Sequence, residues 1–128
     1  LCFHDPWDYK AMIEMMTLYL TSFYVAEADG RIVGFSAGAI EDTDEEKYGH
    51  VCNIAVTPEM RGFGIGRLLL RRVERDFFLE GCRACSLEVR KSNTNAHGFY
   101  ERLDYEDVLV FGGYYSDGED AVVMMRWF

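Results

Sequence analysis

The chain has 128 residues, of which 49% are hydrophobic, 15% aromatic and 27% charged, a composition that fits a globular domain and excludes disordered, collagenous and disulfide-scaffold chains. Its 13 lysines and arginines stand against 22 aspartates and glutamates, and the net charge of −9 repels nucleic-acid phosphates and anionic lipid headgroups. No apolar run approaches the roughly 18 residues that span a bilayer and no signal-peptide pattern is present, so we expect a cytoplasmic protein.

Turn and capping residues divide the chain into helices and strands. Asp5 and Pro6 mark the start of a first helix. Asp29-Gly30 is a turn typical of an antiparallel hairpin, and Gly81 ends a long amphipathic helix. The acidic run 41–47 predicts a solvated loop. In chain order the predicted elements are a helix at 6–20, strands at 23–28, 31–40 and 50–56, a helix at 65–79, a strand at 84–89, a short helix at 95–103, and strands at 106–111 and 121–126.

This order predicts an α/β (α+β) fold, with a mixed sheet and helices on its faces. Parallel pairing is expected only across the helical crossovers, because parallel strands need a long connection. No repeat or linker interrupts the chain, and we expect a single domain over residues 1–128. The helix at 65–79 should face the core through an apolar stripe made of Ile65, Leu68, Leu69, Val73 and Phe77.

The four cysteines do not suggest a disulfide framework. The one close pair, Cys82 and Cys85, lacks the second pair of Cys or His ligands that a tetrahedral zinc site needs. It also runs into a strand, whereas a redox dithiol usually opens a helix. We therefore expect no metal site, and reduced, buried thiols at Cys2, Cys52, Cys82 and Cys85.

A loop rich in glycine connects the strand at 50–56 to the helix at 65–79. Such a loop presents free backbone N–H groups at a helix N-terminus, where a diphosphate fits. A P-loop is excluded because Gly66 is followed by Arg67-Leu68, and a dinucleotide fingerprint is disfavoured by Leu69 at its third glycine position. A tight turn without ligand is the alternative. The candidate binding residues of the loop are Arg61, Gly62, Phe63, Gly64, Ile65, Gly66 and Arg67.

Three blocks resemble one known family. Arg61-x-x-Gly64-x-Gly66 resembles the acetyl-CoA motif Q/R-x-x-G-x-G/A of the GNAT superfamily. The block from Leu87 to Asn93, continued by Ala96, Phe99-Tyr100 and Leu103, and the block from Gly113 to Ala121 are similar to the L-E-V-R-x-S-N and Y-Y-x-D-G-E-D-A blocks of protein N-terminal acetyltransferases. The resemblance covers 23–126 and is closest to the archaeal and eukaryotic catalytic subunits and to the bacterial ribosomal-protein alanine N-acetyltransferase.

The resemblance implies a GNAT acyl-CoA N-acyltransferase fold with a mixed, mostly antiparallel sheet flanked by helices. In that fold a strand and a helix precede the segment near Pro6, so we expect this chain to lack them. Where the family usually has glycine or asparagine after the short helix, this chain has Asp104, which tolerates a positive φ at a helix end.

The resemblance also implies that acetyl-CoA is the cofactor and that it enters a gap between two splayed strands. Backbone N–H groups near Ile54, Ala55 and Val56 would then polarise the thioester carbonyl. Residues 61–67 would hold the pyrophosphate. Asn93 matches an asparagine that binds the pantetheine arm, with a helix N-cap as its structural alternative.

Two residues match the family's acid and base. A free α-amino group has a pKa of about 7.7–8.0, so a base that removes one proton suffices, and Glu88 is the candidate. Tyr100 matches the tyrosine that protonates the departing thiolate. An exposed strand carboxylate and a packed aromatic ring are the respective structural alternatives.

The substrate side of the site is predicted at His50, Tyr114 and Tyr115. His50 would line the substrate mouth or relay a proton, or it is a structural histidine. The two tyrosines lie in a polar loop that covers the peptide in related enzymes, or they only pack the loop. The acidic residues of that loop, Asp117, Glu119 and Asp120, would attract a cationic N-terminus or build the turn.

The function predicted from these residues is transfer of acetyl from acetyl-CoA to the α-amino group of a protein N-terminus, by direct attack in a ternary complex. The expected partners are protein or peptide N-termini, without nucleic acid or membrane, and the sequence does not determine an oligomeric state. The alternatives are acetylation of a lysine side chain or small amine, and a non-catalytic acyl-CoA-binding subunit.

Overall fold

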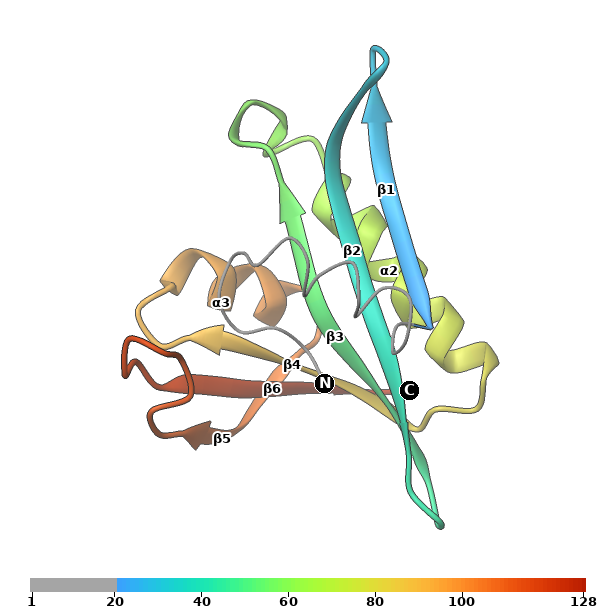
Figure 1. The fold of residues 1–128 in the computed structure, drawn as a ribbon, viewed down its shortest axis with the longest axis vertical. Coiled ribbons are helices and arrows are strands. Elements are labelled where there is room, and N and C mark those ends of the chain that lie inside the picture. Colours follow the sequence, from blue (N-terminus) through green and yellow to red (C-terminus); the bar gives the residue numbers. More distant parts are fainter. Residues whose placement is uncertain (1–20) are drawn as a thin grey trace.

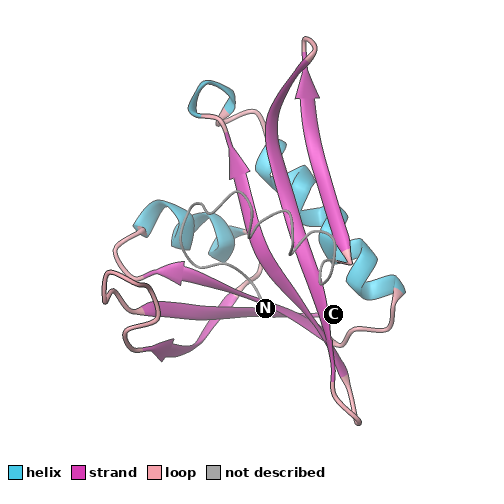
Figure 2. Ribbon diagram, viewed as in Figure 1, coloured by secondary structure: helices cyan, strands magenta, loops and turns pink. Residues whose placement is uncertain are grey.

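The computed structural model describes residues 21–128, and the helix predicted at 6–20 lies outside the described residues. The other predicted elements are present, with ends that differ by a few residues, and a short 3-10 turn precedes the long helix (Figures 1 and 2). In chain order they are β1 Ser22–Ala28, β2 Arg31–Asp42, β3 Lys47–Val56, η1 Pro58–Met60, α2 Ile65–Leu79, β4 Ala84–Arg90, α3 Thr94–Arg102, β5 Glu106–Phe111 and β6 Ala121–Trp127.

The strands form one six-stranded sheet in the order β1-β2-β3-β4-β6-β5. Within residues 21–128 only β3 and β4 pair in parallel, and α2 is the crossover between them, as expected from the element order. The hairpin of β1 and β2 turns at Asp29 and Gly30, with φ of 51° and 75°, the conformation that a type I′ turn requires. Asp104 likewise has a φ of 74° after α3, as predicted.

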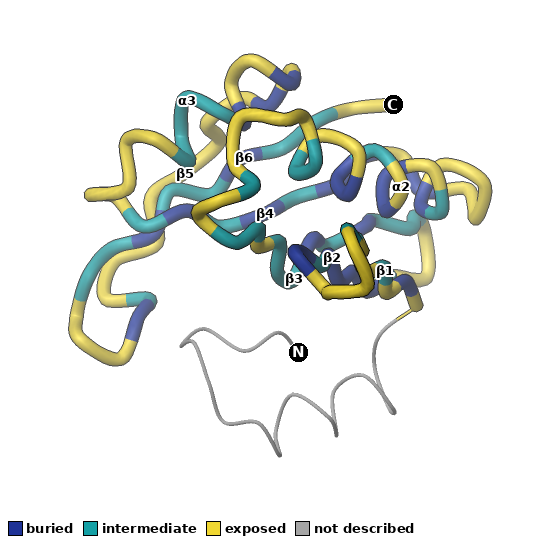
Figure 3. The backbone as a smooth tube through the Cα atoms, turned by 90° about the horizontal axis from the view of Figure 1, so that it is seen from above, coloured by how far each residue is buried: buried dark blue, intermediate teal, exposed yellow. Residues whose placement is uncertain are grey.

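Helix α2 packs against β1, β2 and β3, and Figure 3 shows buried segments where the helix meets these strands. Phe77 is fully buried, and it can approach the sheet because Gly38 and Gly49 lie beneath it; a Cβ on Gly38 would lie 2.6 Å from Phe77 Cζ. The predicted stripe is wrong at Leu68, which is 67% exposed, and it omits Leu70 and Glu74, which are buried.

Strands β3 and β4 separate along their length, as predicted (Figure 1). They pair only from Tyr48↔Ala84 to His50↔Ser86, although both strands continue well beyond. A bulge lies at Cys52, because Ala37 pairs with Asn53 while Gly38 pairs with Val51, and a bulge bends the strand that carries it. The sheet therefore opens beyond His50.

The cysteines differ in part from the prediction. Cys82 and Cys85 are free and buried, as expected. Cys52 is disulfide-bonded, which corrects the expectation of a reduced thiol there. Cys2 lies outside the described residues. In residues 21–128, neither helix has the length and apolar character needed to cross a membrane.

Candidate active site

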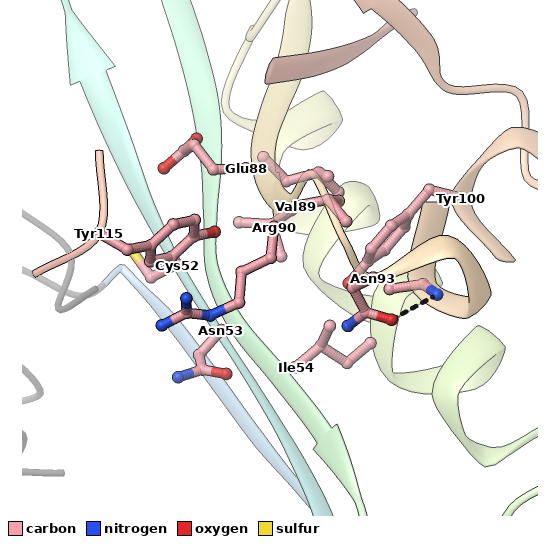
Figure 4. Close-up of a pocket in the computed structure, with 12 residues that line it drawn as sticks. Cys52, Asn53, Ile54, Glu88, Val89, Arg90, Asn93, Tyr100 and Tyr115 are labelled. Atoms are coloured by element: carbon pink, nitrogen blue, oxygen red, sulfur yellow. Dashed lines mark hydrogen bonds between the residues drawn. The ribbon is translucent and has the colours of Figure 1, made fainter. Parts of the chain in front are cut away.

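The opening between β3 and β4 holds a cavity of about 250 Å³ (Figure 4). Four consecutive residues from each strand line it, and α3 and the loop before β6 close it. Since two parallel strands that separate leave backbone N–H and C=O groups unpaired along the gap, the walls offer hydrogen-bonding groups to a ligand. The lining residues are Val51, Cys52, Asn53, Ile54, Leu87, Glu88, Val89, Arg90, Asn93, Ala96, Tyr100 and Tyr115.

Glu88 stands at the centre of a hydrogen-bonded group on the strand side of this cavity. Its Oε1 and Oε2 lie 2.9 and 2.8 Å from His50 Nε2, and the hydroxyl of Tyr114 donates to Oε1 at 2.6 Å. Glu41 Oε1 lies 3.5 Å from the other ring nitrogen of His50. The structure thus brings together three of the predicted residues, Glu88, His50 and Tyr114, and adds Glu41 from β2.

The charges of this group determine its protonation. Burial by itself would lower the pKa of His50, but the hydrogen bond to Glu88 and the charges of Glu88 and Glu41 outweigh it, and the pKa of His50 is raised above its ordinary value. Burial and the hydrogen bond to Glu88 raise the pKa of Tyr114. Tyr114 therefore stays protonated and donates, while Glu88 accepts, so this carboxylate is held in one orientation.

Tyr100 lies on α3, on the opposite side of the cavity from β3 (Figure 4). It is only 8% exposed, and burial raises the pKa of its hydroxyl far above the ordinary value. Its ring packs edge-on against Phe99 and Tyr105, with centroids 5.1 and 5.7 Å apart. Packing and cavity lining are thus combined in one residue, and the hydroxyl is a proton donor at any physiological pH.

A second, larger cavity of about 590 Å³ joins the first. Both are lined by Ile54, Asn93, Ala96 and Tyr100. Its floor is the glycine-rich loop and the start of α2. The predicted binding residues lining it are Ile54, Ala55, Val56, Arg61, Gly62, Gly64, Ile65, Gly66, Arg67 and Asn93. Phe63 does not line it and is 72% exposed.

This second cavity is suited to an anion. Arg61, Arg67 and Arg102 line it, no aspartate or glutamate among the described residues does, and within residues 21–128 none of the three arginines forms an ion pair. Helix α2 begins here without a side-chain cap, and its first intrahelical bond runs from Leu68 N to Gly64 O at 3.1 Å. The N–H groups before Leu68 and the helix dipole are therefore available to phosphate oxygens.

Asn93 is the N-cap of α3, which was the structural alternative to cofactor binding at this position. Its Oδ1 accepts a hydrogen bond from Ala96 N at 3.1 Å and so caps α3 (Figure 4). The cap leaves the amide nitrogen of Asn93 as a donor, and because the residue lines both cavities, this donor is placed where they join.

The loop Gly112–Asp120 carries Tyr114 and Tyr115, and neither tyrosine is exposed. Tyr115 is 9% exposed, and Tyr114 is partly buried against Glu88. The acidic residues of the loop make its internal and strand contacts: Asp117 and Glu119 bind Arg90, and Asp120 accepts from Gly113 N. They build the loop, which was the alternative to attracting a cation.

Sequence reasoning missed several residues of the site. Glu41 was assigned to a solvated loop, and only the extension of β2 to Asp42 places it against His50. Arg90 was read as part of a family block without a role. Five further residues line the second cavity, and only Ala96 and Phe99 among them had a sequence signal, as members of that block: Met60, Asn95, Ala96, Phe99 and Arg102.

Comparison with known proteins shows the family of this chain. Residues 1–105 match the Acetyltransferase (GNAT) family. The chain belongs to this family of acetyltransferases. The resemblance and the fold inferred from the sequence are thereby confirmed.

Several similar proteins align with nearly the whole of this GNAT chain. An uncharacterized N-acetyltransferase of Methanocaldococcus jannaschii is 39% identical over 125 residues, which are 97% of this chain and 78% of the relative. An N-alpha-acetyltransferase of Sulfurisphaera tokodaii is 34% identical, over 97% of this chain and 80% of that protein. Naa20 of Chaetomium thermophilum, solved in complex with a bisubstrate analogue, matches with a TM-score of 0.89 at 26% identity, over 97% of this chain and 75% of that one.

Proposed function

We propose that this GNAT enzyme transfers the acetyl group of acetyl-CoA to the α-amino group of protein N-termini. The observation that carries the proposal is the junction of the two cavities at Ile54, Asn93, Ala96 and Tyr100. The second cavity, lined by arginines, has the charge and size for a phosphorylated cofactor, and the first cavity is lined by the carboxylate of Glu88. The relative named an N-alpha-acetyltransferase supports α-amino groups as the acceptor.

On this proposal the cationic cavity holds acetyl-CoA. The start of α2 with Arg61 and Arg67 binds the pyrophosphate, and Asn93 donates to the pantetheine arm. When bound, acetyl-CoA supplies a thioester carbonyl that an amine can attack. Unpaired backbone N–H groups of β3 near Ile54 polarise that carbonyl, because the bulge and the separation from β4 leave this edge open.

Glu88 accepts the proton of the attacking amine, directly or through water. Tyr114 and His50 fix the orientation of Glu88. Glu88 lines the first cavity, which adjoins the proposed cofactor site. Tyr100 then donates a proton to the departing sulfur. A thiol pKa near 8.5 is below that of tyrosine, so complete proton transfer to the thiolate is uphill. The donation need only be partial in the transition state.

A peptide panel tests the proposal. Short peptides with different first residues and free N-termini are compared with a peptide whose N-terminus is blocked and which carries an internal lysine. CoA release is followed as thiol, and mass spectrometry locates the acetyl group. Acetylation of free N-termini is expected. Acetylation of the blocked peptide would assign a side-chain acceptor, and cofactor binding without transfer to any peptide would contradict the proposal.

A further inference from the structure

Arg90, the last residue of β4, makes a dense set of contacts with the loop Gly112–Asp120. Its guanidinium carbon lies 4.0 Å from the centroid of the Tyr115 ring. Its Nη1 donates to Asp117 Oδ2 at 2.8 Å and to Glu119 Oε1 at 3.0 Å. In Figure 4, Arg90 extends from β4 across the opening toward Tyr115.

The backbone after Arg90 holds the same loop. Ser92 N donates to Glu119 Oε2 at 2.9 Å, and Lys91 N donates to the carbonyl oxygen of Asp120 at 3.1 Å. Backbone hydrogen bonds and the Arg90 charge lower the pKa of Asp117, and hydrogen bonds from Ser92 and Arg90 lower that of Glu119, so both carboxylates are ionised at neutral pH. These contacts anchor the loop at the end of β4.

The same loop carries the hydroxyl that orients the candidate base. The rings of Tyr114 and Tyr115 pack edge-on with centroids 5.0 Å apart, so a shift of Tyr115 displaces Tyr114. Tyr114 donates to Glu88, two residues before Arg90 on β4. Since residues two apart in a strand project to the same face, Arg90 and Glu88 meet the loop on one side of the sheet.

We propose that Arg90 is a positioning residue, which clamps the loop Gly112–Asp120 over the cavity and so holds the hydroxyl of Tyr114 on Glu88. The inference rests on the proposed function, because it assigns Arg90 an effect on the N-terminal acceptor. Arginine suits the task, since its planar guanidinium stacks on the Tyr115 ring while an N–H edge binds two carboxylates. A lysine ammonium at this position would reach the carboxylates or the ring, not both.

Two substitutions test the clamp. Arg90→Met keeps an unbranched apolar stem and removes the guanidinium, and we expect it to raise the KM for the peptide about tenfold, in line with the loss of one cation–π contact and two charged hydrogen bonds. The affinity for acetyl-CoA should not change, because Arg90 does not line that cavity. Arg90→Lys should recover only part of the loss. Equal peptide KM values for Arg90→Met and the unmodified enzyme would overturn the inference.

A double-mutant cycle with Tyr114→Phe separates positioning from general structural damage. If Arg90 acts through Tyr114, Arg90→Met also lowers kcat when Tyr114 is present, and it lowers kcat much less when Tyr114 is already phenylalanine, because the bond to Glu88 is gone in both cases. Independent, multiplicative effects on kcat would contradict the proposed route. Arg83→Met is the matched control, since Arg83 pairs with Glu46 at the other end of β4 and should leave all kinetic constants unchanged.

Hydrogen exchange gives a readout that does not need the acetylation assay. We expect the amides of residues 113–119 to exchange faster in Arg90→Met than in the unmodified protein, with residues 65–79 unchanged. Unchanged exchange at 113–119 would refute the clamp even if no peptide is acetylated. If the unmodified enzyme acetylates no peptide while exchange at 113–119 does accelerate, the proposed function fails and the clamp stands.

Discussion

On the proposed mechanism, the proton of the attacking amine passes to a single residue, Glu88. Glu88→Gln keeps a side chain that can still accept from Tyr114, so the fold should persist while the base is lost. We expect kcat to fall about 10²-fold or more, the usual contribution of a general base, with acetyl-CoA affinity unchanged. Steady-state kinetics and calorimetry measure the two effects. Glu106→Gln, on exposed β5, is the control, and a loss below twofold in Glu88→Gln would exclude Glu88 as the base.

His50 predicts a pH dependence of stability. Its pKa is raised in the folded state, where it faces Glu88, Glu41 and the Tyr114 hydroxyl that shares Glu88. A raised pKa means that protonated His50 stabilises the fold fully below its unfolded value of about 6.5, and that this contribution is lost as the pH rises through the folded value. His50→Gln should therefore cost more unfolding free energy at pH 5.5 than at pH 9 in urea titrations. An equal cost at both values would show that protonation of His50 adds no stability to the folded state.

At the scale of elements, we propose that the start of α2 binds the phosphates of the cofactor. Gly64 has a φ of 81° at the N-cap, and a non-glycine residue pays roughly 1–2 kcal/mol in that region, so Gly64→Ala should displace the first turn. We expect acetyl-CoA affinity to fall about tenfold, since the N–H groups then no longer converge on the phosphates. Gly81→Ala is the matched control, because Gly81 has a φ of 87° at the other end of the helix. Titration calorimetry should show a loss of acetyl-CoA affinity for Gly64→Ala but not for Gly81→Ala. Similar losses in the two variants would assign the effect to general backbone strain.

On the scale of the whole molecule, buried Glu74 connects α2 to the rest of the sheet. Its carboxylate accepts from the Tyr105 hydroxyl at 2.6 Å, and from Arg71 and Arg126 at 2.7 and 3.2 Å. Cys85 Sγ of β4 lies 3.0 Å from the same hydroxyl, and burial raises the pKa of this thiol to about 12, so it stays protonated. The group thereby joins α2, β4, β6 and the segment before β5.

Loss of this carboxylate should destabilise the whole fold. Glu74→Ala leaves the Tyr105 hydroxyl without its acceptor and two arginines without their charge partner, and we expect a loss of about 2–3 kcal/mol in unfolding free energy. Glu74→Gln retains an acceptor for Tyr105 and should lose less. Urea unfolding measures both, and a change below about 0.5 kcal/mol in Glu74→Ala, the usual range for surface positions, would show that the group is not a structural link.

Local sequence patterns determined most of the secondary structure and the lining of the cationic cavity. Asp29-Gly30 defines its own turn, and the glycines from Gly62 to Gly66 with the flanking arginines predict an anion site, because positive φ and a bare helix start are local properties. The order of the elements limits parallel pairing to the two helical crossovers, and the described sheet has it across α2 but not across α3, because β6 lies between β4 and β5. The turn and the glycine-rich loop depend on residues that are neighbours in the chain.

Contacts between distant segments were decided only by the tertiary structure. The sequence shows Glu74 as a polar residue within an amphipathic helix, and only the packing of α2 on the sheet buries it against Tyr105 and Arg126. Likewise, nothing in the sequence indicates the partners of Glu41 and Arg90. Glu41 meets His50, and Arg90 meets the loop before β6, only when the sheet is assembled. A polar side chain is compatible with either solvent or a buried partner, and which of the two it has depends on atoms far away in the sequence.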